Sequence, residues 1–199
     1  MQMRERVRHF ANFCSCGSEL DTSICCAAGA ARKQNIPHSP RAEAVLKLAR
    51  IALERNDFVK ATEICIGFLS FVPGNEEALF LISIARIKEG RRESAKAVLN
   101  RILQLNPKNV DARSCIGGVL FEEGNFSEAL FHAKIALEAA PNDARVHELM
   151  GITLTELRNL RKGEFHFGKA VAYSAQFDAA IVAILPWGTV LLQQAAPSS

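Results

Sequence analysis

Prolines recur at a constant spacing in this sequence, and that spacing constrains the fold more than any other feature. Pro73, Pro107 and Pro141 follow one another at steps of 34 residues. Self-similarity at a fixed period of about 20 to 50 residues is the signature of a repeat architecture. We therefore predict a chain built from repeated units. Small residues keep the same step at Ala61, Ala95, Ala129 and Gly163.

Each unit has the pattern of two helices joined by a short turn. The turns read RND from Arg55, EGR from Glu89 and EGN from Glu123, where Asn or Gly accepts the left-handed backbone that ends a helix. After the second helix a proline stops the chain, and a nearby Asn or Asp offers an oxygen that caps the next helix. Abundant Ala, Leu, Ile and Glu favour helix over strand. We predict an all-α fold in which one unit is one antiparallel helical hairpin.

These residues resemble the tetratricopeptide repeat family, which places small, apolar and proline residues at set positions of its repeat. The resemblance implies an α-solenoid of stacked antiparallel helical hairpins, that is, a right-handed superhelix with a concave inner surface. No unit has the family's early Trp, and the fourth unit has Ala175 where the proline belongs. The third unit fits best, through Ile116, Gly117, Leu120, Gly124, Ala129, Ala133, Ala136 and Pro141.

The repeat divides the chain into three parts. Residues 1–41 form an N-terminal tail that contains cysteines and is expected to be poorly ordered. Residues 178–199 form an apolar C-terminal helix or cap with a short tail. Four alternatives stay open for that apolar segment: it caps the last unit, enters the chain's own groove, continues a longer array, or joins copies into a homo-oligomer. Between these ends lie four tetratricopeptide-like units, 42–75, 76–109, 110–143 and 144–177.

The resemblance also implies a binding groove, because in the family the first helix of each unit lines the concave face. Family members that hold the acidic carboxyl end of chaperones use Lys, Arg and Asn there. The matching positions here are mostly Leu, Ile, Phe and Glu, so we expect a different ligand. Ordinary packing between units is the alternative role for each of these side chains. The predicted groove residues are Leu46, Arg50, Leu53, Phe80, Ile84, Ile87, Ser114, Gly118, Phe121, Glu148 and Ile152.

The resemblance implies a scaffold or adaptor for protein–protein interaction, which binds a peptide or an amphipathic helix of another protein. The sequence lacks the nucleotide-binding, zinc-protease and serine-hydrolase motifs, so we expect no enzyme and no cofactor. An alternative is a non-catalytic recruiting region, or fragment, of a larger enzyme such as a repeat-containing sulfotransferase or glycosyltransferase. An RNA-binding helical repeat fits less well, because the predicted groove has at least as many Glu as basic residues.

Charge and hydropathy bound the remaining partners. The net charge of +3, from 24 basic and 21 acidic residues, is too slight for a typical nucleic-acid binder. The first residues lack the apolar run of a secretory signal. The most apolar stretch, 179–192, is short for a membrane span and is interrupted by Pro186 and Gly188. We therefore expect a cytoplasmic protein with neither a nucleic-acid nor a membrane partner.

Four of the six cysteines gather in the N-terminal tail. A tetrahedral zinc site normally takes paired thiolates in a C-x-x-C spacing, which the tail lacks. We expect no metal site, and palmitoylation or the absence of any role are the alternatives for these thiols. The weak candidates for metal ligands are Cys14, Cys16, Cys25 and Cys26.

Overall fold

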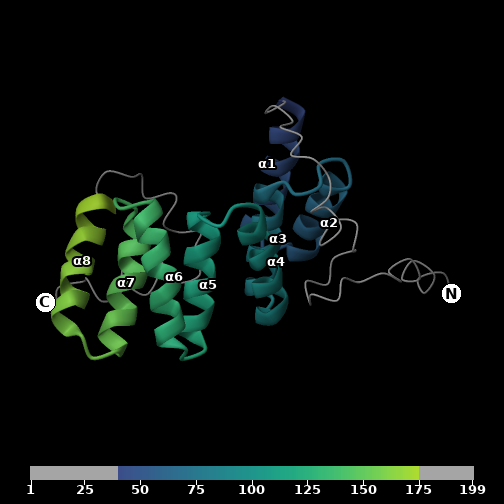
Figure 1. Ribbon diagram of the computed structural model, residues 1–199. Helices are drawn as coiled ribbons and strands as arrows, with labels where there is room; N and C mark the ends of the chain where they lie inside the picture. Colours follow the sequence, from purple (N-terminus) through teal and green to yellow (C-terminus); the bar gives the residue numbers. More distant parts are fainter. Residues whose placement is uncertain (1–39, 175–199) are drawn as a thin grey trace, which may run out of the picture. The chain divides into compact units, whose positions relative to one another are not determined.

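The computed structural model describes residues 40–174, and the regular elements in this part of the chain are all helices. This confirms the predicted all-α class. The helices are α1 (Pro40–Glu54), α2 (Phe58–Leu69), α3 (Glu76–Lys88), α4 (Arg92–Leu105), α5 (Val110–Glu122), α6 (Phe126–Ala139), α7 (Ala144–Glu156) and α8 (Leu160–Ser174) (Figure 1).

The two ends of the chain lie outside the described residues. This applies to the predicted tail as far as residue 39, with its four cysteines, and to the predicted C-terminal cap 178–199. Residues 40 and 41, which the sequence assigns to the tail, belong to α1. Among the helices of residues 40–174, none has the length and apolar character that crossing a membrane requires.

The helices form two compact units, each of which is larger than one repeat and contains two hairpins. Unit 1 contains α1 to α4, unit 2 contains α5 to α8, and the chain divides between them after Pro107. In unit 1, α1 packs against α2 and α3, α2 packs against α3, and α3 packs against α4. Unit 2 repeats this arrangement with α5, α6, α7 and α8 (Figure 1). Neighbouring helices thus pair as hairpins, and hairpins stack within each unit as in a helical solenoid. The boundaries of the four predicted repeats and a superhelix continuous over all four hairpins stay predictions.

The first helices of the second, third and fourth hairpins begin at side-chain caps one repeat apart. Asn75 Oδ1 accepts from the Ala78 N–H at 2.8 Å, and Asn109 Oδ1 accepts from the Ala112 N–H at 2.8 Å. Asp143 also caps its helix, α7, because its Oδ1 accepts from the Arg145 backbone N–H at 2.9 Å. These bonds satisfy N–H groups that a helix leaves unpaired at its start, and they confirm the predicted caps.

The turns inside the hairpins share one left-handed residue at each step of the repeat. Asn56 has φ 59°, Gly90 75° and Gly124 78°, as the turn sequences predict. The fourth turn places Arg158 at φ 60°. Because a side chain crowds the backbone in this conformation, Arg158 is strained where Gly is not.

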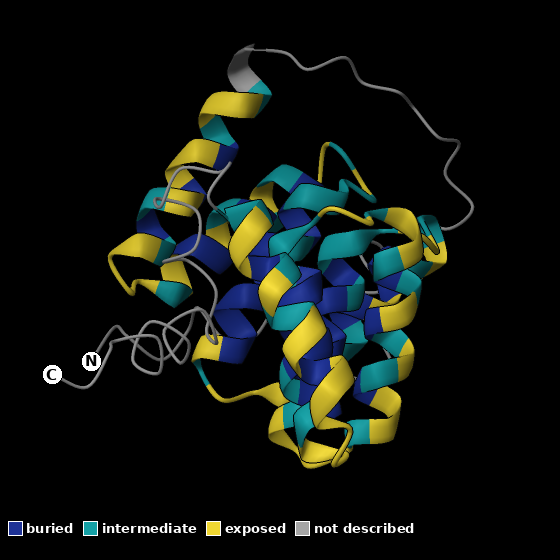
Figure 2. Ribbon diagram, turned by 90° about the vertical axis from the view of Figure 1, so that its left-hand side faces the viewer, coloured by how far each residue is buried: buried dark blue, intermediate teal, exposed yellow. Residues whose placement is uncertain are grey.

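Small side chains allow the two helices of a hairpin to approach closely. Ala95 and Ala129 are fully buried, and Gly163 holds the same position in α8. A Cβ at Gly163 would lie 2.6 Å from Thr155 Oγ1 and 3.2 Å from the Gly151 carbonyl oxygen. Figure 2 shows the buried residues on the sides of the helices that face their neighbours. The small-residue column of the sequence is therefore buried in each hairpin, and at Gly163 the approach leaves no room for a side chain.

Candidate functional site

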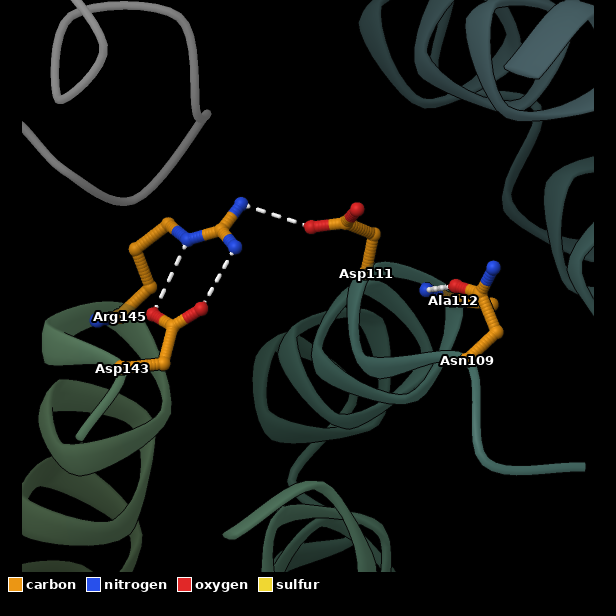
Figure 3. A network of polar contacts seen from close by, with 5 residues as sticks. All are labelled: Asn109, Asp111, Ala112, Asp143 and Arg145. Carbon is orange, nitrogen blue, oxygen red and sulfur yellow. Dashed lines mark hydrogen bonds and ion pairs between the residues drawn. The ribbon is translucent and has the colours of Figure 1, made fainter. Parts of the chain in front are cut away.

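An ion-pair network joins the first helices of the two hairpins in unit 2. Arg145, at the start of α7, donates from Nη1 to Asp111 Oδ1 on α5 at 2.8 Å. The same guanidinium donates from Nη2 to Asp143 Oδ2 at 2.7 Å and from Nε to Asp143 Oδ1 at 3.1 Å. Figure 3 shows Arg145 between the two carboxylates, with Asn109 capping α5 beside them. The network therefore holds the beginnings of α5 and α7 side by side.

The carboxylate of Asp143 stays charged in this network. Burial opposes its charge, but the hydrogen bonds and the attraction from Arg145 outweigh burial and hold the pKa of Asp143 below its ordinary value. Asp143 thus serves both as the cap of α7 and as the counter-ion of Arg145. Asp143 caps the start of α7 and holds the guanidinium of Arg145, which makes the contact with α5.

The predicted groove residues of unit 2 lie on the faces that follow this network along α5 and α7. Phe121 is half-buried and its ring packs on Phe126, with centroids 5.4 Å apart. Ile152 is half-buried and packs against the core cluster of Leu149 and its neighbours. Both side chains therefore combine core packing with partial exposure, so packing accounts for part of their role. The buried members of the predicted set in this unit are Ser114, Gly118 and Glu148.

The predicted groove residues of unit 1 divide in a similar way. Arg50 is exposed and forms an ion pair with Glu77, the residue of α3 that holds the repeat position of Asp111. Leu53 and Phe80 are half-buried. The buried members are Leu46, Ile84 and Ile87. Each unit presents its own face of first helices, and a groove shared by both units stays a prediction.

Glu148 has an electrostatic environment that sequence reasoning missed. Its side chain is 9% exposed, and burial alone raises the pKa of its carboxyl to about 7. Ser114, at the same repeat position on α5, is 6% exposed and its Oγ has no hydrogen-bond partner among the described residues. The repeat identifies these positions, but a carboxylate in a helix pattern gives no sign that it is buried without a cation.

Two histidine contacts recur at one repeat position in unit 2. In the third hairpin, Arg113 Nη1 lies 3.4 Å from His132 Nδ1. In the fourth, His147 Nδ1 lies 2.8 Å from His166 Nδ1, and His147 Nε2 lies 3.0 Å from the Pro141 carbonyl oxygen. A carbonyl can only accept, so His147 Nε2 donates to it, and one of the two facing Nδ1 atoms donates to the other. These imidazoles join the helices of each hairpin, as packing residues do.

The described residues offer little material for catalysis or metal binding. Cys65 and Cys115 are buried and unpaired, and burial raises the pKa of the Cys65 thiol to about 12 and shifts Cys115 in the same direction. Such thiols are inert, because the thiolate is the reactive form. Within residues 40–174, no group of three or more His, Cys, Asp and Glu side chains is placed to hold a metal ion.

Sequence comparison supports the repeat. Residues 86–152 match the sequence model of the tetratricopeptide repeat family. This segment runs from the end of α3 in unit 1 into α7 of unit 2. No curated protein matches the sequence.

Solved structures of MamA have a similar fold. The MamA 41-end structure from Desulfovibrio magneticus RS-1 is 23% identical, with a TM-score of 0.58, over 79% of this chain and 88% of that chain. The MamA RS-1 ArsTM double mutant is 25% identical, with a TM-score of 0.57, over 69% of this chain and 77% of that chain. The MamA MSR-1 C2 structure is 23% identical, with a TM-score of 0.52, over 69% and 79%. At these identities the likeness concerns the fold.

The paired helices, the repeated caps and the stacked hairpins define an α-helical repeat protein. Residues 86–152 match the tetratricopeptide repeat family, and the fold is similar to that of the MamA structures. Helical repeat proteins present extended surfaces that bind other molecules. In general terms, the chain is a protein-interaction scaffold.

Proposed function

We propose that the chain binds a peptide or a helix of a partner protein on the faces formed by the first helices of its hairpins. These faces are α1 with α3 in unit 1 and α5 with α7 in unit 2. The observation that carries the proposal is the ion pair of Arg145 with Asp111, which holds α5 and α7 side by side. Neighbouring first helices present a surface wider than one helix, and a bound segment needs such a surface.

The chemistry of the two faces favours an apolar segment. Leu53 and Phe80 in unit 1, and Phe121 and Ile152 in unit 2, keep part of their apolar surface exposed. Apolar anchors of this kind contribute much of the binding free energy at protein interfaces. The groove positions of unit 2 include a glutamate and no basic residue, which opposes the binding of an acidic carboxyl terminus.

The proposal is tested by binding assays on surface variants that keep the fold. Phe80→Lys in unit 1 and Phe121→Lys in unit 2 place a charge at a partly buried apolar anchor, and we expect each to reduce recovery of partner proteins. Glu63→Lys and Glu138→Lys, at exposed positions of α2 and α6, are the controls and retain recovery. Helical content measured by circular dichroism confirms that each variant is folded. Unchanged recovery with both Phe variants would contradict the proposal.

The remaining expectations about function belong to the same proposal. The chain acts by binding and needs no cofactor for it. A cytoplasmic location, the lack of nucleic-acid and membrane partners, and a homo-oligomer formed through the C-terminal apolar segment stay predictions from the sequence.

A further inference from the structure

Two polar side chains in unit 2 lack partners at the same repeat position. Ser114 on α5 and Glu148 on α7 are one 34-residue step apart, and α5 contacts α7. Asp111 and Arg145, which form the interhelical ion pair, lie three residues earlier on the same two helices. Three residues bring a helix back to nearly the same face. Ser114 and Glu148 therefore lie at matching levels of α5 and α7, one turn beyond the ion pair that joins the two helices.

Two other buried hydroxyl groups on first helices of the hairpins bond locally, on α3 and on α7, whereas Ser114 does not. Ser83 Oγ donates to the Phe80 carbonyl at 2.6 Å, and Thr153 Oγ1 donates to the Leu149 carbonyl at 2.6 Å. The enclosed Ser114 Oγ makes no such bond. Because the great majority of buried polar groups in folded proteins are hydrogen-bonded, an enclosed hydroxyl with no partner calls for an explanation.

Glu148 is the second unsatisfied group. No hydrogen bond or ion pair joins its carboxyl to another described residue, and burial is the cause of its raised pKa. Arg145, one turn away on the same helix, is already bound to Asp111 and Asp143. Burial disfavours the charged form of an uncompensated carboxylate, and a cation supplied from outside offsets that cost.

We propose that Ser114 and Glu148 form a subsite for a basic group, the ammonium of a lysine or the guanidinium of an arginine, on the bound segment of the partner protein. This inference rests on the proposed binding function of the α5 and α7 face. The Glu148 carboxylate accepts charge-assisted hydrogen bonds from the cation, and Ser114 supplies the polar side chain at the matching position of α5. Phe121 and Ile152, partly exposed on the same two helices, suit the aliphatic stem of such a side chain.

The test begins with a random peptide library selected on the full chain. We expect enriched peptides to carry a lysine or arginine between apolar residues. For one selected peptide, and for the same peptide with norleucine in place of the basic residue, titration calorimetry then measures Kd with the wild type and with Glu148→Gln. The variant should raise the Kd of the basic peptide by about 10- to 100-fold, as expected for the loss of a hydrogen bond to a charged group. It should change the Kd of the norleucine peptide little. Glu156→Gln, exposed on the same helix, is the matched control and leaves both affinities unchanged.

A second readout follows Glu148 itself. In an NMR titration of the carboxyl carbon, binding of the basic peptide should lower the pKa of Glu148 from about 7 towards or below its ordinary value. A peptide that binds equally well to the wild type and to Glu148→Gln, with the pKa unmoved, overturns the basic subsite. If Phe121→Lys nevertheless abolishes that binding, the proposed function of the face stands. A library that yields no peptide sensitive to Phe80→Lys or Phe121→Lys contradicts the proposed function as well.

Discussion

Arg145 reaches back one repeat to Asp111, and the two charged groups lie 2.8 Å apart on neighbouring first helices. The contact joins two positions separated by one period of the sequence, so it links consecutive hairpins of unit 2. Its side chains are partly exposed, 29% for Arg145 and 47% for Asp111. Solvent therefore screens their attraction, and its contribution to stability is modest.

A double-mutant cycle on this pair should reveal a small favourable coupling. We expect Asp111→Asn and Arg145→Gln to show an interaction free energy of about 0.5 to 1 kcal/mol in urea unfolding. Arg145→Gln alone should cost more than Asp111→Asn alone, because it also removes the partner of Asp143. Strictly additive single variants would show that the pair does not link the hairpins.

Arg158 offers a stabilising substitution. Its backbone is left-handed at φ 60°, the conformation that Gly124 and Gly90 adopt one and two repeats earlier. Arg158→Gly should raise the free energy of unfolding by roughly 1 kcal/mol, because glycine removes the steric cost of this conformation. The reciprocal variant, Gly124→Arg, should lower it by a similar amount. Denaturant unfolding measures both variants. A midpoint below that of the wild type for Arg158→Gly, or above it for Gly124→Arg, would contradict the strain assigned to the left-handed turn residue.

Gly163 and Gly168 give opposite predictions within one helix. A methyl group at Gly163 would meet Thr155 and the Gly151 backbone, so Gly163→Ala should destabilise the fold by about 1 to 3 kcal/mol. A Cβ at Gly168 has no atom within 4 Å, so Gly168→Ala should stabilise α8 by up to about 1 kcal/mol through helix propensity. The melting temperatures of both variants, compared with that of the wild type, test the two predictions. Equal effects would show that α7 and α8 do not approach closely at Gly163.

Glu148 makes stability depend on pH in one direction. Its pKa is raised in the folded state to about 7, so the folded protein holds a proton that the unfolded chain releases near pH 4.5. Its contribution is therefore fully present below pH 4.5 and is lost as pH rises through 7. Glu148→Gln mimics the protonated form and should stabilise the protein at pH 8, by on the order of 1 to 2 kcal/mol after solvent screening, but not at pH 4. An equal gain at both pH values would contradict the buried carboxyl.

The histidine contacts make stability depend on pH in the direction opposite to that of Glu148. Burial and the facing Arg113 lower the pKa of His132, and burial and the facing His147 lower the pKa of His166. The neutral imidazoles contribute stability above the ordinary value of 6.5, and this is lost as pH falls towards their depressed folded-state pKa values. In a Glu148→Gln background, stability should therefore decline below pH 6.5, and adding His132→Gln and His166→Gln should flatten that decline. Urea unfolding across this range is the measurement.

The period of the sequence predicted much of the local structure, because caps and turns depend on residues close together in the chain. Asn75 and Asn109 cap helices where the repeat places them, and Gly90 and Gly124 adopt the expected left-handed backbone. The fourth turn was missed, because Arg158 has no intrinsic preference for that conformation.

The candidate site was harder to predict, because its properties depend on contacts between helices. Family resemblance selected Phe121 and Glu148 by position alone. Packing of Phe121 on Phe126 depends on how the two helices of one hairpin meet, and burial of Glu148 without a cation depends on its surroundings in the folded chain. The division after Pro107 likewise reflects contacts between helices, since the repeat continues through that point in the sequence.

Site-specific photo-crosslinking in cells tests the central claim most directly. A photoreactive amino acid is placed at Leu53 or Ile152 on the faces of first helices, and at Glu63 or Glu138 on exposed positions of second helices as matched controls. The account predicts covalent adducts with a partner protein at Leu53 or Ile152, and few or none at the controls. Adducts at Glu63 and Glu138 alone, with none at Leu53 or Ile152, would contradict it.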